Sequence, residues 1–126
     1  MKKEQTIRQA LRSRFGRTKP SSVLDVAKRL KWLLSNPNRW AKGSYGTHKD
    51  STSCCIVGAI SQIGGRFQTR ASNKIYRMVP IRFTGAIGFN DSRTTTHETI
   101  KKFLSHVVKH INEPNPPRFK PEAKGK

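Results

Sequence analysis

Residues 51–65 read STSCCIVGAISQIGG and contain both cysteines of the chain. Ser53 is a preferred residue type for a helix N-cap, and Gly64-Gly65 is a typical helix end. The apolar residues between them fall on most faces of the predicted helix, as expected for a helix surrounded by other elements. Gly58 in its middle indicates the close approach of another helix. We therefore predict a buried central helix that begins at a cap at Ser53.

Two further stretches have the spacing of amphipathic helices. Ser22 with Asp25 forms an N-terminal capping pattern, and apolar residues then recur with the period of one helix face until Asn36-Pro37. Thr95 with Glu98 forms a T-x-x-E capping box before a second run of this kind. These two helices are expected to pack around the buried one. They cover residues 22–35 and 95–111.

The segment between the buried helix and the last helix is less regular. A basic polar link at residues 66–74 precedes a short helix to Met78, and Pro80 prevents the helix from continuing. We expect a short extended segment or hairpin near residues 76–89. The residues expected to pack inward there are Ile81, Phe83 and the Ala86-Ile87 pair. The predicted fold class is mainly α, a compact single domain with a buried central helix packed by two amphipathic helices.

The chain divides into three parts by composition. Residues 1–20 contain seven basic residues and one acidic residue, with a narrow apolar stripe at Ile7, Leu11 and Phe15. Thr6 and Gly16 are a suitable cap and end for a helix there, but so thin a stripe is expected to order only on contact with the core, with nucleic acid or with a partner. Residues 112–126 contain four prolines and one large apolar residue. We predict flexible basic arms, namely an N-terminal arm at 1–20 and an extended tail at 112–126, around a globular core at 21–111.

The charge balance indicates the class of partner. Lys and Arg number 26 against 7 Asp and Glu, which gives a formal net charge of +19. Cations that reach phosphates release counterions, so a chain this basic is expected to bind DNA or RNA without sequence preference. The residues predicted to contact phosphate are Arg8, Arg12, Arg14, Arg17 and Lys19 in the arm and Arg66, Arg70, Lys74 and Arg77 in the central link. The alternative is a binding module or inhibitor that docks on an acidic surface of a host protein or nucleoprotein machine.

A third interpretation is a cysteine-dependent enzyme. Cys54 or Cys55 at a helix start would have a lowered thiol pKa, and His97 with Asn90 or Asp91 would complete a Cys-His-Asn arrangement. The competing structural interpretation places the cysteines in the core and makes Asn90-Asp91 a turn before the last helix. We favour the structural interpretation and expect no catalytic activity and no cofactor.

Metal binding and membrane insertion find little support in the sequence. Four histidines are present, but neither a C-x-x-C nor an H-E-x-x-H pattern occurs, so we predict no metal site. No apolar run approaches the ~20 residues of a membrane span, and no apolar region follows the basic N-terminus as in a secretory signal. The N-terminus also has the composition of a transit peptide. Adjacent cysteines favour reduced thiols, and we expect a cytoplasmic protein; the oligomeric state stays open.

Two motifs together suggest a family. Cys55-Ile-Val-Gly-Ala-Ile60 opens the buried helix, and Gly88-Phe-Asn90-Asp91 precedes Thr95-x-x-Glu98. The combination resembles a small family of uncharacterised domains of bacteria and their phages, which reads C-L-x-G-A-L and later Asn-Asp and T-x-x-E/D-V. The resemblance covers residues 22–111, with Phe89 where many members have Trp. It implies a compact, mostly helical fold and supplies no activity. The small size and basic arms would suit a phage-encoded accessory protein in the host cytoplasm.

Overall fold

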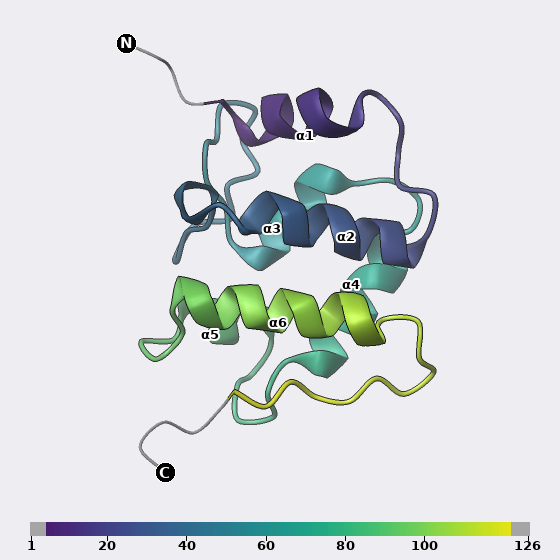
Figure 1. Cartoon of the computed structure of the whole chain (residues 1–126). Coiled ribbons are helices and arrows are strands. Elements are labelled where there is room, and N and C mark those ends of the chain that lie inside the picture. The colour runs from purple at the N-terminus through teal and green to yellow at the C-terminus, as the bar shows by residue number, and fades with distance from the viewer. Residues whose placement is uncertain (1–4, 122–126) are drawn as a thin grey trace.

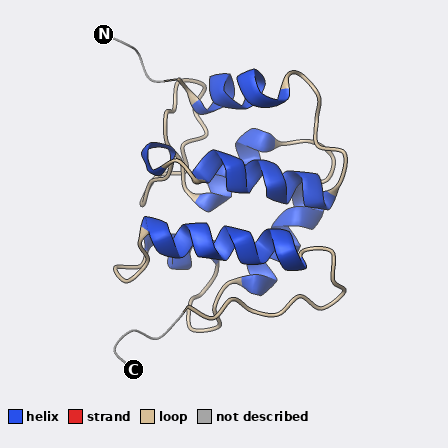
Figure 2. Cartoon of the chain, in the orientation of Figure 1, coloured by secondary structure: helices blue, strands red, loops and turns tan. Residues whose placement is uncertain are grey.

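The computed structural model describes residues 5–121, and these residues form six α-helices and one 3-10 helix (Figure 1). No strand occurs within this range (Figure 2), where an isolated parallel bridge joins Trp40 and Cys54. The elements are α1 (Ile7–Phe15), α2 (Val23–Leu34), η1 (Pro37–Arg39), α3 (Ile56–Ile63), α4 (Gln68–Met78), α5 (Ala86–Asp91) and α6 (His97–His110). The predicted fold class is confirmed. None of the helices described is long and apolar enough to cross a membrane.

Helices α1, α2 and α6 lie side by side in the front of Figure 1, and α3, α4 and α5 lie behind them. Helix α2 runs opposite to α1 and α6 and packs against α1, α3, α4 and α6. The apolar face of α2 is fully buried, since Val26, Leu30 and Leu33 have no exposed area. The predicted buried helix, α3, packs on α1, α2, α4 and α5. The core therefore lies between the two layers, with α2 in contact with most of it.

The two amphipathic helices form where the sequence predicts them. The Ser22 hydroxyl accepts a hydrogen bond from the Asp25 backbone N–H at 3.0 Å, so the cap of α2 is confirmed. Helix α6 begins one residue later than predicted. Its capping box joins Thr96 and Thr99, and Thr95 is buried instead. The capping box predicted from Thr95 and Glu98 is therefore wrong, because the adjacent threonine, Thr96, caps the helix instead and Thr99 is its partner.

The start of α3 also differs from the prediction at Ser53. The cap is Cys55, whose Sγ accepts a hydrogen bond from the Gly58 N–H at 3.4 Å. The backbone just before it is extended and pairs with the preceding loop. The Cys54 N–H donates to the Arg39 carbonyl, and the Cys55 N–H donates to the Ser44 carbonyl. These hydrogen bonds hold the chain out of helical geometry until residue 55.

The central segment is more helical than expected. The basic link predicted at residues 66–74 lies mostly within α4, whose Ala71, Ile75 and Met78 are buried at i, i+4 and i+7. The short extended segment or hairpin expected near 76–89 does not form a strand: α4 continues to Met78, turns and bends follow, and α5 begins at Ala86. Ile81, predicted to pack inward, is 81% exposed, and Ile87 is also exposed. Ala86 is buried and Phe83 packs against the core as predicted.

The core extends beyond its expected start at residue 21. Helix α1 has the predicted cap at Thr6 and end at Gly16, and it packs on α2 and α3. Ile7 and Ala10 are buried, and the Ile7 N–H donates to the Ser51 carbonyl at 2.8 Å. The thin apolar stripe is therefore ordered by contact with the body of the protein itself. The charges of Lys2, Lys3 and Glu4 lie outside the described residues.

The described part of the C-terminal tail has an extended backbone but is anchored. It runs back past the end of α6 toward the loop between α4 and α5 (Figure 1). Phe119, the one large apolar residue of the tail that was predicted to be flexible, is 9% exposed and packs on Phe89 and Phe103. Its N–H donates to the Met78 carbonyl at 2.7 Å, and the Arg118 side chain donates to the Val79 carbonyl. The end of the predicted tail, residues 122–126, lies outside the described residues.

Gly58 provides a test of this packing. A Cβ atom at position 58 would lie 1.4 Å from the Tyr45 carbonyl oxygen, so the element that approaches α3 here is the loop before it and not another helix. Gly58→Ala should lower the free energy of unfolding by about 3 kcal/mol or more, because backbone and helix must separate. Ser61→Ala, on an exposed position of the same helix, is the control. Urea denaturation measures both; a loss below about 1 kcal/mol for Gly58→Ala would contradict the packing described.

Candidate nucleic-acid interface

Four of the nine residues predicted to contact phosphate meet in one cleft. The cleft has a volume of about 680 Å³ and lies between α1, the α1–α2 loop and the C-terminal end of α3. Arg8 and Arg12 come from α1, and Arg17 and Lys19 come from the loop. The opposite wall consists of Ser61, Gln62, Ile63 and Gly64. Segments about 50 residues apart in the sequence thus form one concave, basic surface, which we call the basic cleft.

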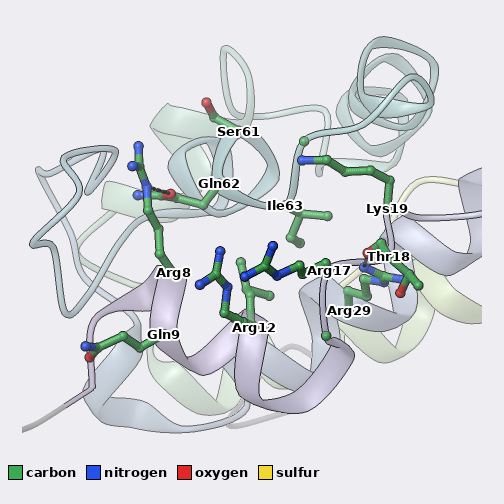
Figure 3. A pocket seen from close by; sticks show the side chains of 13 residues that line it. Arg8, Gln9, Arg12, Arg17, Thr18, Lys19, Arg29, Ser61, Gln62 and Ile63 are labelled. Atoms are coloured by element: carbon green, nitrogen blue, oxygen red, sulfur yellow. Dashed lines mark hydrogen bonds between the residues drawn. The ribbon is translucent and has the colours of Figure 1, made fainter.

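The local structure explains why the four cations converge. Arg8 and Arg12 are four residues apart, so they project from one face of α1. Gly16 then ends the helix with φ of 68°, a left-handed conformation that favours glycine, and turns the chain back. Figure 3 shows Arg12 and Arg17 pointing into the middle of the cleft, while Lys19 reaches in from its far side.

Arg29, at the base of the cleft, was not among the predicted contacts. It is 8% exposed, forms an ion pair with Asp25 at 3.2 Å and donates to the Thr18 carbonyl at 2.8 Å. Arg29 thereby ties the loop that carries Arg17 and Lys19 to α2. Burial alone would raise the pKa of the Asp25 carboxyl. Hydrogen bonds from Ser21 and Arg29, together with the positive charge of Arg29, outweigh this effect, so the pKa is lowered. The i, i+4 spacing of Asp25 and Arg29 was the available signal.

Gln62 fixes Arg8 from the opposite wall. The Arg8 Nε–H donates to Gln62 Oε1 at 3.1 Å, as the dashed line in Figure 3 marks. The Gln62 amide nitrogen in turn donates to the carbonyls of Gly46 and His48 at 3.0 and 3.3 Å. The guanidinium is held by its Nε, and the hydrogen bonds of the described residues include no acceptor for its two terminal nitrogens. Such a fork matches the oxygens of a phosphate.

The electrostatics of the cleft are one-sided. None of its thirteen lining residues is acidic. Among the residues that the structure describes, the ion pairs do not include Arg8, Arg12, Arg17 or Lys19, and all four side chains are exposed. Cations gathered in a concave site reinforce one another's potential and concentrate anions there.

The other predicted contacts lie apart from the cleft. Arg14 lies over the rings of Phe15 and Trp32. Arg66 stacks on Phe67, and Arg70 and Arg77 are exposed on α4. Lys74 has a structural contact, because its ammonium donates to the Ile111 and Glu113 carbonyls at 2.8 and 3.1 Å. A lysine at this position satisfies carbonyls that the end of α6 leaves without helical partners.

The structure brings the residues of the cysteine-enzyme hypothesis near one another, but with other contacts. Cys54 and Cys55 are both buried, and burial, with a smaller contribution from Cys55, raises the pKa of the Cys54 thiol to about 12. His97 Nε2 hydrogen-bonds to the Leu34 carbonyl at 2.8 Å. Within residues 5–121 no hydrogen bond joins either thiol to a histidine. The arrangement lacks the base contact that would activate a nucleophile.

Asn90 is fully buried and connects distant segments. Its Oδ1 accepts hydrogen bonds from Trp40 Nε1 at 2.7 Å and from the Ile56 N–H at 3.2 Å. Its Nδ2 donates to the Ala41 carbonyl and to Asp91 Oδ1, both at 2.9 Å. The Asp91 Oδ1 also accepts from the Gly43 N–H at 2.9 Å. These two side chains hold the loop after η1 and the first turn of α3 against α5.

The histidines of the last helix contact the C-terminal tail. The His106 and His110 rings lie 4.5 Å apart. His106 Nε2 hydrogen-bonds to the Pro117 carbonyl, and His110 pairs with Glu113. No group of three or more potential metal ligands of the His, Cys, Asp or Glu type occurs in the part of the chain described.

Comparisons with known protein families, with curated proteins and with solved structures give no match to this chain. The resemblance to a small bacterial and phage domain family therefore stays a prediction. The geometry and charge of the basic cleft are the features that indicate what the protein binds.

The thiols allow a direct test of the enzyme hypothesis. Because the pKa of Cys54 is raised to about 12, its thiolate is scarce at pH 7–9, and alkylation by iodoacetamide should require unfolding. We expect reaction at least a hundredfold slower than in urea, measured by mass spectrometry. Rapid alkylation of the native protein would contradict the structural interpretation.

The raised pKa of Cys54 also predicts a pH dependence of stability. The free energy of unfolding should fall as pH rises above 9.0, because the thiol of the unfolded chain ionises there and the thiol of the folded protein ionises only near 12.

Replacement of Asn90 tests its role as a connector. Asn90→Ala leaves the Trp40 indole N–H, the Ile56 N–H and the Ala41 carbonyl without this partner. Each buried unpaired group costs about 1–3 kcal/mol, so we expect a loss of about 3–5 kcal/mol in the free energy of unfolding. Asn73→Ala, at an exposed position of α4, should change stability by less than about 0.5 kcal/mol. Equal effects of the two variants in urea denaturation would overturn this role.

Proposed function

We propose that this protein binds DNA or RNA without sequence preference and that the basic cleft is its main phosphate-binding site. The observation that carries the proposal is the convergence of Arg8, Arg12, Arg17 and Lys19 on one concave surface without an acidic lining residue. Exposed cations dispersed over a surface would only make the protein basic, whereas cations placed around a recess can form a binding site.

The chemistry of the cleft favours phosphate as the anion. Three of the four exposed cations are arginines, whose planar forks bind phosphate oxygens in pairs. Each phosphate so bound releases a counterion, which gives strong affinity at low salt that weakens as salt rises. Cations outside the cleft, including Arg66, Arg70 and Arg77, would add only weaker contacts along the same polymer, because they are not gathered around a recess. No element that reads base edges follows from this arrangement, in line with binding without sequence preference.

The proposal also covers catalysis, the location of the protein and the alternative partner. The protein acts without catalysis, and it works in the cytoplasm, which would be that of the host if a phage encodes it. An acidic protein surface is the alternative partner, because carboxylates can occupy the same cations. Removal of residues 1–20 would not separate these partners, because Ile7 and Ala10 belong to the core.

A charge-matched pair of double variants tests the site. Arg12→Gln with Arg17→Gln removes two cleft charges, and Arg70→Gln with Arg77→Gln removes two exposed charges from α4. Affinity for labelled single strands, duplex DNA and structured RNA is measured over ~50–200 mM salt. We expect the cleft variant to bind about tenfold or more weakly and to lower the salt slope by about 2, as two phosphate contacts imply. The α4 variant should lose less than about threefold.

Two results would contradict the proposal in different ways. Equal losses for the two variants would show that charge alone, and not the cleft, determines binding. If no polymer binds below ~10 μM at low salt, nucleic-acid binding itself is wrong. A pull-down from nuclease-treated lysate would then test for an acidic protein partner.

A further inference from the structure

An aromatic pair lies beside the basic cleft. Phe15, the last residue of α1, contacts Trp32 of α2 edge to face, with ring centroids 5.4 Å apart and planes at 83°. Both side chains are half-buried. Three guanidinium groups lie against them: Arg29 at 4.6 Å from the Phe15 ring, Arg39 at 4.7 Å from the Trp32 ring, and Arg14 at 5.9 Å from each.

Arg29 connects this pair with the cleft. Its guanidinium lines the cleft and also lies over Phe15, and its hydrogen bond to the Thr18 carbonyl holds it in this position. A path of arginines and rings thus runs from the cleft over Arg29, Phe15 and Trp32 to Arg39. Arginines alternating with aromatic rings are the arrangement used to bind single strands, whose bases stack on the rings.

The recess itself is better suited to a single strand than to a duplex. Leu11 and Ile63 line it together with the cations, so it offers apolar as well as charged surface. A duplex keeps its bases stacked inside and presents only phosphate and sugar to such a recess. A single strand can place a phosphate on the arginines and turn the attached sugar and base toward the apolar lining or the rings.

Other aromatic residues of the surface lack this combination. Trp40 is engaged by its hydrogen bond to Asn90. Phe67 and Phe83 each have one arginine near the ring, Arg66 and Arg82, and neither of these arginines lines the basic cleft, whereas Arg29 does. Trp32 and Phe15 are distinguished by three arginines around two touching rings.

We propose that the basic cleft and the Phe15–Trp32 pair form one binding surface for single-stranded nucleic acid. The phosphates lie on Arg8, Arg12, Arg17 and Lys19, and bases stack on Trp32 and Phe15. This inference depends on the proposed function, because it specifies which nucleic acid the cleft prefers. It also assigns Trp32 a contact that charge alone would not predict.

The experiment compares a 20-nucleotide oligo(dT) with a 20-base-pair duplex at one salt concentration. We expect the single strand to bind the native protein at least tenfold more tightly and to quench its tryptophan fluorescence. Trp32→Leu should weaken single-strand binding about tenfold, because one stacked base is lost, and change duplex binding less than twofold. Trp32→Phe should retain part of the affinity. Tyr76→Leu, which removes an exposed ring from α4, is the matched control and should change neither.

The outcomes separate this inference from the proposed function. If the duplex binds as tightly as the single strand and Trp32→Leu weakens both or neither, the single-strand inference is wrong while nucleic-acid binding stands. If neither polymer binds, both are wrong. Circular dichroism checks that each variant is folded. If Trp32→Leu does not fold, the fluorescence of the native protein decides, because an unchanged tryptophan signal at saturation would overturn the stacking.

Discussion

The buried amide of Asn90 joins three parts of the chain that are far apart in sequence. It accepts hydrogen bonds from the Trp40 side chain and the Ile56 backbone and donates to the Ala41 carbonyl. The Ile56 N–H belongs to the first turn of α3, which leaves it without a helical partner. Asn90 therefore helps to fix the start of α3, together with the hydrogen bonds of residues 54 and 55. Because Gln62 and Ile63 at the end of α3 and the cap residue Gly64 line the basic cleft, the same amide indirectly places one wall of the cleft.

The opposite wall of the basic cleft, helix α1, has fewer buried residues than α3. Helix α1 has only nine residues, and its buried contacts come from Ile7 and Ala10. Its capping box and the hydrogen bond from Ile7 to Ser51 add to them, and Arg29 fixes the loop that follows. The single ion pair of Arg29 with Asp25 satisfies the buried guanidinium without reducing the charge of the exposed cations. More carboxylates here would stabilise α1 and would also cancel the potential of the cleft.

The sequence predicted the parts of the fold that depend on local periodicity. Helices α2 and α6 follow from their apolar spacing, and Ser22 follows from its capping pattern. The start of α3 did not follow, because the hydrogen bonds of residues 54 and 55 to the preceding loop are long-range and a thiol replaced the usual hydroxyl cap. The burial of Phe119 and of Ile7 likewise depends on surfaces formed by other elements. In the cleft, the charges of α1 were visible in the sequence. The contribution of Gln62 was not, because it depends on how α1 and α3 meet. The spacing of Asp25 and Arg29 predicts their ion pair, but not that Arg29 lines the cleft.

A short helix with two buried residues thus carries one wall of the basic cleft. Regions with few buried contacts open most readily, and α1 is such a region. Folding brings Arg8, Arg12, Arg17 and Lys19 close enough to repel one another within about one Debye length, so α1 is held against electrostatic strain. A bound polyanion would convert this repulsion into attraction and would stabilise the folded state by mass action. A short, highly charged helix therefore contributes little to stability by itself, and it is stabilised when a ligand supplies the opposite charge.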